Sequence, residues 1–143
     1  MTASGKYRQC ESVNLFRLLP AVLSGAEDLM ADMNVEQMMQ GLDAKGEPLY
    51  FYRSPSYAEL KQRMNSTPDF GVADFRDTGA FHRSLTASVD GDRVVFNATD
   101  PKTPDLLEKS ENMFGLTTMS KLKLKETYLQ DASILAVKDV CRL

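Results

Sequence analysis

The clearest structural signal in the chain is the stretch FHRSLTASVDGDRVVFNA, which spans residues 81–98. Its first half alternates in polarity: Phe81, Leu85, Ala87 and Val89 fall on one face, and His82, Ser84, Thr86 and Ser88 fall on the other. This period of two predicts a β-strand over 81–89, with an interruption of the apolar face at Arg83. The sequence Asp90-Gly91-Asp92 predicts a tight turn that leads into a return strand over 93–98. We therefore expect an antiparallel β-hairpin at the centre of the fold.

Helical periodicity precedes the hairpin. An apolar stripe with spacings of three and four runs from about residue 9 to residue 33 and consists of Leu15, Leu19, Val22, Ala26, Leu29 and Met33. Pro20 removes one backbone hydrogen bond from this segment, so we expect it to kink the helix or to split it in two. Asn34 has the position of a new N-cap, with Gln37 three residues later and Gly41 as a stop. This spacing predicts a separate short helix over 35–40.

The segment between these helices and the hairpin combines turns with one further helix. Residues 42–48 have turn chemistry, and Leu49-Tyr50-Phe51-Tyr52 is an aromatic, strand-like run. Ser54-Pro55 is an N-cap followed by proline, which predicts a helix over about 55–64. Residues 65–79 contain few apolar anchors, and we expect them to form an exposed loop.

Two more helices are predicted after the hairpin. Thr103-Pro104 repeats the cap-then-proline signature and opens a helix to about residue 112, and Gly115 ends it. A long C-terminal helix then begins at Thr117 or Thr118 and runs to about residue 139. Its expected apolar side consists of Met119, Leu122, Leu129, Ala136, Val137 and Val140. The predicted class is α+β, with N-terminal helices, a central antiparallel hairpin or small sheet, and a long C-terminal helix.

The composition is that of an ordinary folded chain of 143 residues, 43% hydrophobic and 26% charged, which we expect to form one domain over 1–143. Lys plus Arg number 17 against 20 Asp plus Glu, so the net charge is −3. No strong positive field is available, which argues against a dedicated nucleic-acid binder. One His and two Cys exclude a His-rich or Cys-rich metal site and a disulfide scaffold. We therefore expect no metal and no cofactor.

The chain ends give expectations about location. Residues 1–8, expected to be flexible, lack the apolar run of a secretory signal, and no apolar run approaches the ~18 residues of a membrane span. We therefore expect synthesis in a cytoplasm and no membrane partner. Cys10 and Cys141 are expected to be reduced thiols, and whether they approach one another is left open.

Residues that could perform chemistry are few. His82 is the only histidine, and we expect it to face solvent from the polar face of its strand. The acids form a loose set around the loop and the hairpin: Asp69, Asp74, Asp77 and Asp100. Paired carboxylates serve glycoside hydrolysis or bind hard cations, but turn-forming, solvated acids are the simpler interpretation. Lys121, Lys123 and Lys125 spread over more than one helix face, and we expect them to be solvated.

Methionines concentrate near the end of the first helical region. The cluster consists of Met30, Met33, Met38 and Met39. Methionine fills irregular core gaps and also suits adaptable interfaces, so both interpretations stay open.

Several short motifs follow one another in a recognisable order. GLDAKGEPL at 41–49 precedes YRSPSYA at 52–58 and Lys61; DFRDTGAFHRSL at 74–85 and the DGDRV turn at 90–94 follow. This order resembles the virion-morphogenesis and tail-completion proteins of tailed bacteriophages. That family shows a D-x-x-G-like segment, S-x-x-Y/L-x-x-x-K, then L-x-D-T-G-x-L-x-x-S and a D-x-x-V-x-V strand. Asp77, Thr78, Gly79 and Ser84 match the third motif, and Val94-Val95 match the strand.

The resemblance extends over roughly residues 34–116. Family members often follow the hairpin with Tyr-Ala and an aromatic-Gly pair, whereas this chain has DLLEK at 105–109 and MFGL at 113–116. Asp and Thr can bond the backbone and Gly relaxes φ, so the Asp77-Thr78-Gly79 motif is expected to be a structural turn that launches the strand rather than a catalytic group.

The resemblance implies a non-enzymatic virion protein: a homo-oligomeric ring subunit, at the neck as a head-tail connector or at the tail end, which assembles in the host cytoplasm. Its partners would be itself and neighbouring neck, portal or tail proteins, with no sequence-specific nucleic acid. A hexamer and a dodecamer both remain open. The expected inter-subunit contacts involve loop 65–79, the terminal helix, and a set consisting of Met30, Met33, Met38, Met39, Phe70 and Phe75.

Two other classes of function remain open. A small hydrolase would use Asp74, Asp77, Asp100 or Glu108, and would need one of these acids buried in a pocket with a raised pKa. An adaptor or inhibitor would bind one host protein through a methionine-rich surface.

Overall fold

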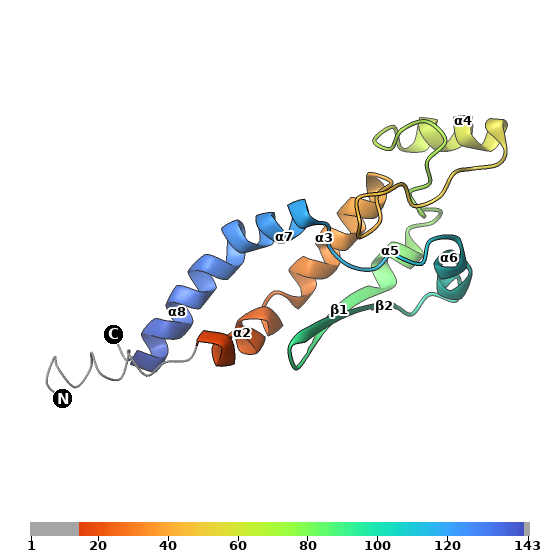
Figure 1. Ribbon diagram of the computed structural model, residues 1–143. Coiled ribbons are helices and arrows are strands. Elements are labelled where there is room, and N and C mark those ends of the chain that lie inside the picture. The colour runs from red at the N-terminus through yellow and green to blue at the C-terminus, as the bar shows by residue number, and fades with distance from the viewer. Residues whose placement is uncertain (1–14, 142–143) are drawn as a thin grey trace, which may run out of the picture.

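The computed structural model describes residues 15–141 (Figure 1). The N-terminus predicted to be flexible (1–8) and the predicted start of the first helix (9–14) lie outside the described residues. The α+β class is confirmed: residues 15–141 combine helices with one two-stranded antiparallel sheet. Figure 1 shows α2 and α3 running beside the C-terminal helices in the opposite direction, with the hairpin on the other side of α3.

The first helical region is broken, but not at proline. Helix α2 (Leu15–Ser24) contains Pro20, and α3 (Glu27–Met39) begins after Gly25 and Ala26. A side chain at Gly25 would lie 2.4 Å from the hydroxyl of Tyr128 on the C-terminal helical segment. The helix therefore breaks where glycine lowers helix propensity and where the neighbouring segment packs against the backbone.

The predicted short helix over 35–40 is wrong. Asn34 lies inside α3, which continues without interruption to Met39. The side-chain amide of Asn34 is fully buried, and it forms hydrogen bonds with Met113 and Gly115 instead of capping a helix. The capping-box spacing was accidental, because the same two amide side chains make tertiary contacts. Gly41, with φ 77°, follows the end of α3 as expected.

The next segment agrees with the sequence at its helix and differs in its strand. Helix α4 (Pro55–Met64) begins after the N-cap Ser54, whose hydroxyl accepts the N–H of Tyr57. The strand-like run 49–52 does not form a strand: an isolated antiparallel bridge joins Phe51 to Val72.

The hairpin is confirmed, but its first strand is shorter than predicted. Residues Ala80–Ser84 form one helical turn, α5, and the strands are β1 (Leu85–Asp90) and β2 (Arg93–Ala98). The register pairs Leu85 with Ala98 and Asp90 with Arg93. Phe81 and Leu85 are four residues apart, so both can be buried with 81–84 helical, and the Arg83 interruption marked this boundary.

The helices after the hairpin follow the prediction with shifted ends. Helix α6 (Thr103–Lys109) has Lys102 rather than Thr103 at its N-cap position, without a capping hydrogen bond from the side chain, and it stops before residue 112. Thr117 caps the C-terminal segment, which comprises α7 (Thr118–Leu124), the π-helical turn η1 (Lys125–Leu129) and α8 (Gln130–Cys141). The Thr117 hydroxyl accepts the N–H of Ser120 at 3.1 Å.

The predicted apolar side of this C-terminal segment is partly wrong. Met119 and Leu122 are exposed, whereas Leu124 is buried in the core. The π turn inserts an extra residue into the helical period, so a simple 100° rotation assigns the faces incorrectly. The side chains of residues 140 and 141 lie outside the described part, and the question of a Cys10–Cys141 approach stays open.

The core lies where α3, the hairpin and the 113–116 segment meet. It consists of Ala26, Met30, Ala31, Met33, Met38, Leu49, Phe81, Leu85, Ala87, Ala98, Met113, Leu116 and Leu124. Asn34 and Gln37 fasten this region: the Asn34 amide donates to Met113 O (3.0 Å) and accepts from Gly115 N–H (3.0 Å). The Gln37 amide donates to Gly115 O (2.9 Å) and accepts from Thr117 N–H (2.8 Å). No helix within residues 15–141 combines the length and apolarity needed to cross a bilayer.

Candidate functional site

The motif residues Asp77, Thr78, Gly79 and Ser84 build a connection rather than a cleft. Thr78 Oγ1 accepts the N–H of Ala80 (3.3 Å), and Gly79, with φ 86°, occupies the N-cap position of α5. Ser84 Oγ donates to Phe81 O (2.9 Å) and accepts from the N–H of Asp100 (3.1 Å). The turn therefore launches a helical turn, not the strand directly as expected. Ser84 ties the start of β1 to the segment that follows β2.

Asp77, unlike the other motif residues, forms an ion pair at the surface. Its carboxylate accepts from Lys102 Nζ at 2.9 Å, and both side chains are exposed. The hydrogen bond and charge of Lys102 lower the pKa of Asp77, and the same contact raises the pKa of Lys102. This pair bridges the motif and the start of α6 at the surface.

A buried ion pair holds the motif segment against α4. Lys61 Nζ lies 3.1 Å from Asp74 Oδ1, with side-chain exposures of 8% and 4%. Lys61 also donates to Arg76 O, and Arg76 N–H donates to Asp74 Oδ1 (2.9 Å). Asn65 donates to Asp74 Oδ2 (3.0 Å) and to Met39 O (2.9 Å). These bonds connect α3, α4 and the 72–76 segment.

Burial and hydrogen bonds in this cluster shift the pKa values of Asp74 and His82. Burial alone would raise the pKa of Asp74, but hydrogen bonds from Arg76 N–H, Asn65 and Lys61 outweigh it, and the pKa is lowered. His82 Nε2 lies 2.9 Å from Asp74 O, which assigns this nitrogen as the donor. Burial lowers the pKa of His82. The expectation of a solvent-facing His82 is wrong, because helical residues 80–84 turn the ring inward.

An aromatic cavity of about 250 Å³ lies beside this cluster. Its walls include Tyr50, Tyr52, Tyr57 and Phe75. The rings of Tyr52 and Tyr57 meet edge to face at 5.0 Å, and Lys109 Nζ lies 5.4 Å above the Tyr50 ring. Burial and the Asp74 charge raise the pKa of Tyr52. Tyr50 and Tyr52 line the cavity while Phe51 is exposed, so the 49–52 run alternates like a strand without belonging to the sheet.

The expected inter-subunit contacts divide into buried and accessible residues. Met30, Met33 and Met38 belong to the core, so the prediction that they contact other subunits is wrong. These three side chains are buried because they belong to the same core cluster as residues of the hairpin and of the 113–116 segment. Met39 is half-buried. In loop 65–79, which has no helix or strand, Phe70 is 61% exposed, whereas Ala73 and Asp74 are buried.

Phe75 has an unusual backbone. Its φ is 56°, a region that non-glycine residues rarely adopt, and its ring lines the aromatic cavity. The bonds of Asp74 and Arg76 on either side hold this conformation. Phe75 is therefore half-buried within its own chain.

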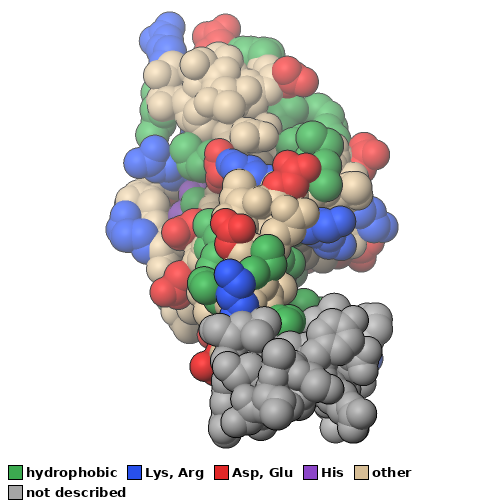
Figure 2. Space-filling view, turned by 90° about the vertical axis from the view of Figure 1, so that its left-hand side faces the viewer, with side chains coloured by type: hydrophobic (Ala, Val, Ile, Leu, Met, Phe, Trp, Pro, Cys, Tyr) green, Lys and Arg blue, Asp and Glu red, His purple; other side chains and the backbone are tan. Residues whose placement is uncertain are grey.

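Most of the large exposed apolar side chains gather in two separate regions, whereas Leu19, Leu29 and Val95 are exposed elsewhere. Around α4 they are Phe51, Leu60, Met64 and Phe70, and on the C-terminal segment they are Met119, Leu122, Ile134 and Leu135. Figure 1 shows α4 and α8 at opposite ends of the molecule. Figure 2 shows Lys/Arg and Asp/Glu side chains interspersed on one face, with apolar side chains between them.

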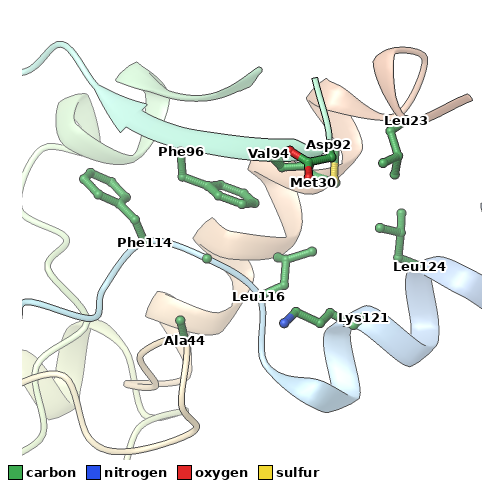
Figure 3. A pocket seen from close by; sticks show the side chains of 11 residues that line it. Leu23, Met30, Ala44, Asp92, Val94, Phe96, Phe114, Leu116, Lys121 and Leu124 are labelled. Carbon is green, nitrogen blue, oxygen red and sulfur yellow. The ribbon is translucent and has the colours of Figure 1, made fainter. Parts of the chain in front are cut away.

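A larger apolar groove opens beside β2. It has a volume of about 640 Å³ and lies between the hairpin, α3 and α7. Figure 3 shows Val94 and Phe96 on β2 facing a wall formed by Leu116, Lys121 and Leu124. Val94 and Phe96 are only half-buried, because this side of the hairpin is not fully covered.

The four acids suggested for a hydrolase do not form a paired site. Asp74 is the one that is buried, and its pKa is lowered rather than raised. Asp77 bonds Lys102, and Asp100 Oδ1 accepts the N–H of Lys102 at 2.9 Å. Glu108 is exposed. Among the described residues, no group of three His, Cys, Asp or Glu side chains could hold a metal ion.

Comparisons of the chain with protein-family models, curated proteins and solved structures found no match.

Sequence reasoning named Lys61, Asp74 and His82 separately but missed that they form one cluster. The available signal was that each of the three directly follows an apolar residue, which is Leu60, Ala73 or Phe81. It also missed the role of Asn34 and Gln37, whose spacing of three places both amides on one side of α3.

Proposed function

We propose that this chain is a structural subunit of a tailed-bacteriophage particle, of the neck or tail-completion class, and that it assembles with copies of itself into a ring. The sequence resemblance over 34–116 suggests the class. The observation that carries the assembly is the pair of separate exposed apolar regions, one around Phe70 and one around Leu135 (65% exposed).

Two different surfaces are what a ring requires. In a head-to-tail contact, one surface of a subunit meets a different surface of the next, and repetition closes a ring when the rotation permits. Exposed apolar patches rimmed by charges are typical of protein contacts. Phe70 and Leu135 lie in segments at opposite ends of the molecule, so the same chain can be joined at both ends.

The buried cluster supports this role by fixing the first surface. Phe70 lies in the loop that follows α4, and this loop is held by Asn65 at one end and by Asp74 at the other. A rigid loop loses less conformational freedom when it binds, which favours a defined contact geometry.

Surface substitutions test the proposal. Phe70→Glu and Leu135→Glu each place a charge in one of the two surfaces, and Thr67→Glu and Gln130→Glu are matched controls at exposed positions in the same segments. We expect each of the first pair to abolish rings seen by electron microscopy and each control to retain them.

Mixing the two variants sharpens the test. A head-to-tail contact leaves one intact surface on each variant, so Phe70→Glu and Leu135→Glu together should form heterodimers that cannot close. Native mass spectrometry of the mixture distinguishes these species by mass. Rings formed equally well by all four variants would refute the assignment of the two surfaces.

A further inference from the structure

Within residues 15–141, α3 contacts one edge of the sheet, and the other edge has no backbone partner. On β1, Val89 donates its N–H to Glu27 Oε1 at 2.8 Å, so the outer edge of this strand is bonded to α3. In the part of the chain that the structure describes, the sheet consists of β1 and β2, so its other edge is the outer edge of β2. An open strand edge carries a row of backbone donors and acceptors that can pair with another strand.

The bond of Val89 shows which groups of β2 face outward. Val89 lies opposite Val94, and its N–H points away from the hairpin toward Glu27. Val94 is therefore in a non-hydrogen-bonded pair, and its own N–H and C=O point out of the opposite edge. Phe96 lies two residues further along β2, so its N–H and C=O point out of the same edge. Among the described residues, no hydrogen bond reaches the N–H of Val94 or of Phe96.

The edge has defined ends. The N–H of Ala98 donates to Asn97 Oδ1 at 2.8 Å, so this next donor along the strand is not available to another chain. At the other end, Gly91 and Asp92 form the turn. Two residues, Val94 and Phe96, therefore remain for pairing.

We propose that this edge of β2 is a self-association surface, which pairs antiparallel with β2 of a second copy of the chain in a register centred on Val95. In this register Val94 lies opposite Phe96 of the second copy, and the two free residues of each strand exchange all of their outward bonds. Registers shifted by two residues would instead use the Asp92 turn or the blocked N–H of Ala98.

The side chains suit the same register. Arg93 would lie opposite Asn97 and Val95 opposite Val95, so no like charges meet directly across the new ladder. Residues directly opposite share a face, so Val94 and Phe96 of the second copy extend the apolar face beside the groove in Figure 3. A second copy thus supplies the backbone partners and continues the apolar face of the sheet.

This contact joins identical surfaces, so it is separate from the head-to-tail contacts of a ring and does not depend on the proposed function. It could join two rings or two free subunits.

Disulfide trapping tests the register. Val95 and its copy would form a non-hydrogen-bonded pair, in which Cα atoms lie about 4.5 Å apart, within disulfide range. In a chain with Cys10→Ser and Cys141→Ser, we expect Val95→Cys to give a disulfide-linked dimer under mild oxidation. Ser88→Cys is the matched control. Ser88 is also exposed and pairs with Val95, but it lies on β1, one strand further from the twofold axis that would relate the two copies, so it should not cross-link.

Cross-linking of Ser88→Cys to the same extent, or no cross-link at Val95→Cys, would overturn the proposal even if rings form.

A second variant tests the backbone hydrogen bonds of the proposed contact. Val94→Pro removes an outward N–H and no bond of the β1–β2 ladder, and Val94→Ala is its control because both substitutions shorten a side chain that packs against the core. We expect the proline to weaken self-association by about tenfold or more relative to the alanine, as measured by analytical ultracentrifugation, with the circular dichroism of the two variants alike. Unchanged association would overturn it.

Discussion

Lys61 and Asp74 form a buried ion pair, 3.1 Å between Nζ and Oδ1, which fastens the segment before the Asp77-Thr78-Gly79 turn to helix α4. Lys61 approaches this site from the end of α4, and Asp74 also accepts bonds from Asn65 and from the backbone of Arg76. Neither charge has access to much water, so each depends on the other.

Removal of one partner should therefore be costly. Lys61→Met leaves Asp74 buried without its cation, and we expect the free energy of unfolding to fall by about 3–5 kcal/mol. Urea denaturation measures this change. The matched control is Lys102→Met, which breaks the exposed pair with Asp77 and should change stability little. Equal effects of the two substitutions would contradict the assigned role of burial.

Acid should weaken the same cluster. The folded-state pKa of Asp74 is lowered from 3.8, so the contribution of its ionised form is present above 3.8 and is lost as the pH falls through the lowered value. Asp74→Asn should flatten the stability curve below pH 3.8. Thermal unfolding monitored across this range by circular dichroism provides the measurement.

His82 gives a second pH dependence, which begins at a higher pH. Burial lowers its pKa from 6.5, so the folded state keeps the ring neutral while the unfolded chain takes up a proton below 6.5. Stability should therefore decrease as the pH falls from 6.5 toward the lowered pKa and then level off. His82→Gln retains a nitrogen donor for Asp74 O without this titration. If the slope between pH 6.5 and the lowered pKa survived in the variant, its assignment to His82 would be wrong.

The buried amides of α3 should be as important as an apolar core residue. Asn34→Ala leaves Met113 O and Gly115 N–H without their partners, and each unpaired buried group costs about 1–3 kcal/mol. Chemical denaturation should show this loss, and amide hydrogen exchange should accelerate at Gly115. Glu36→Ala, on the exposed side of the same helix, is the control.

The sequence predicted those elements whose signals are local. Ser54 and Thr117 cap their helices through their own hydroxyls, and the Asp90–Arg93 turn closes the hairpin. The errors share a cause: a residue with a local interpretation is used in a tertiary contact. Asn34 has the spacing of an N-cap but bonds Met113 and Gly115, which are about 80 positions away.

The candidate contact surfaces were predictable only in part. Phe70 was correctly placed in an accessible loop, whereas Met30 and Met38 are in the core because the hairpin and the 113–116 segment cover α3. No local pattern tells which side of a helix a distant segment will cover. The π turn at 125–129 similarly shifts the exposed face of the C-terminal segment.

The mass of the assembled chain in solution tests the central claim, self-assembly into a ring, most directly. Native mass spectrometry of the full chain over a series of increasing concentrations, with negative-stain electron microscopy of the same samples, reports stoichiometry and shape. We expect one discrete, closed oligomer that replaces smaller species as concentration rises. A monomer at every concentration, or a dimer that never grows further, would contradict it.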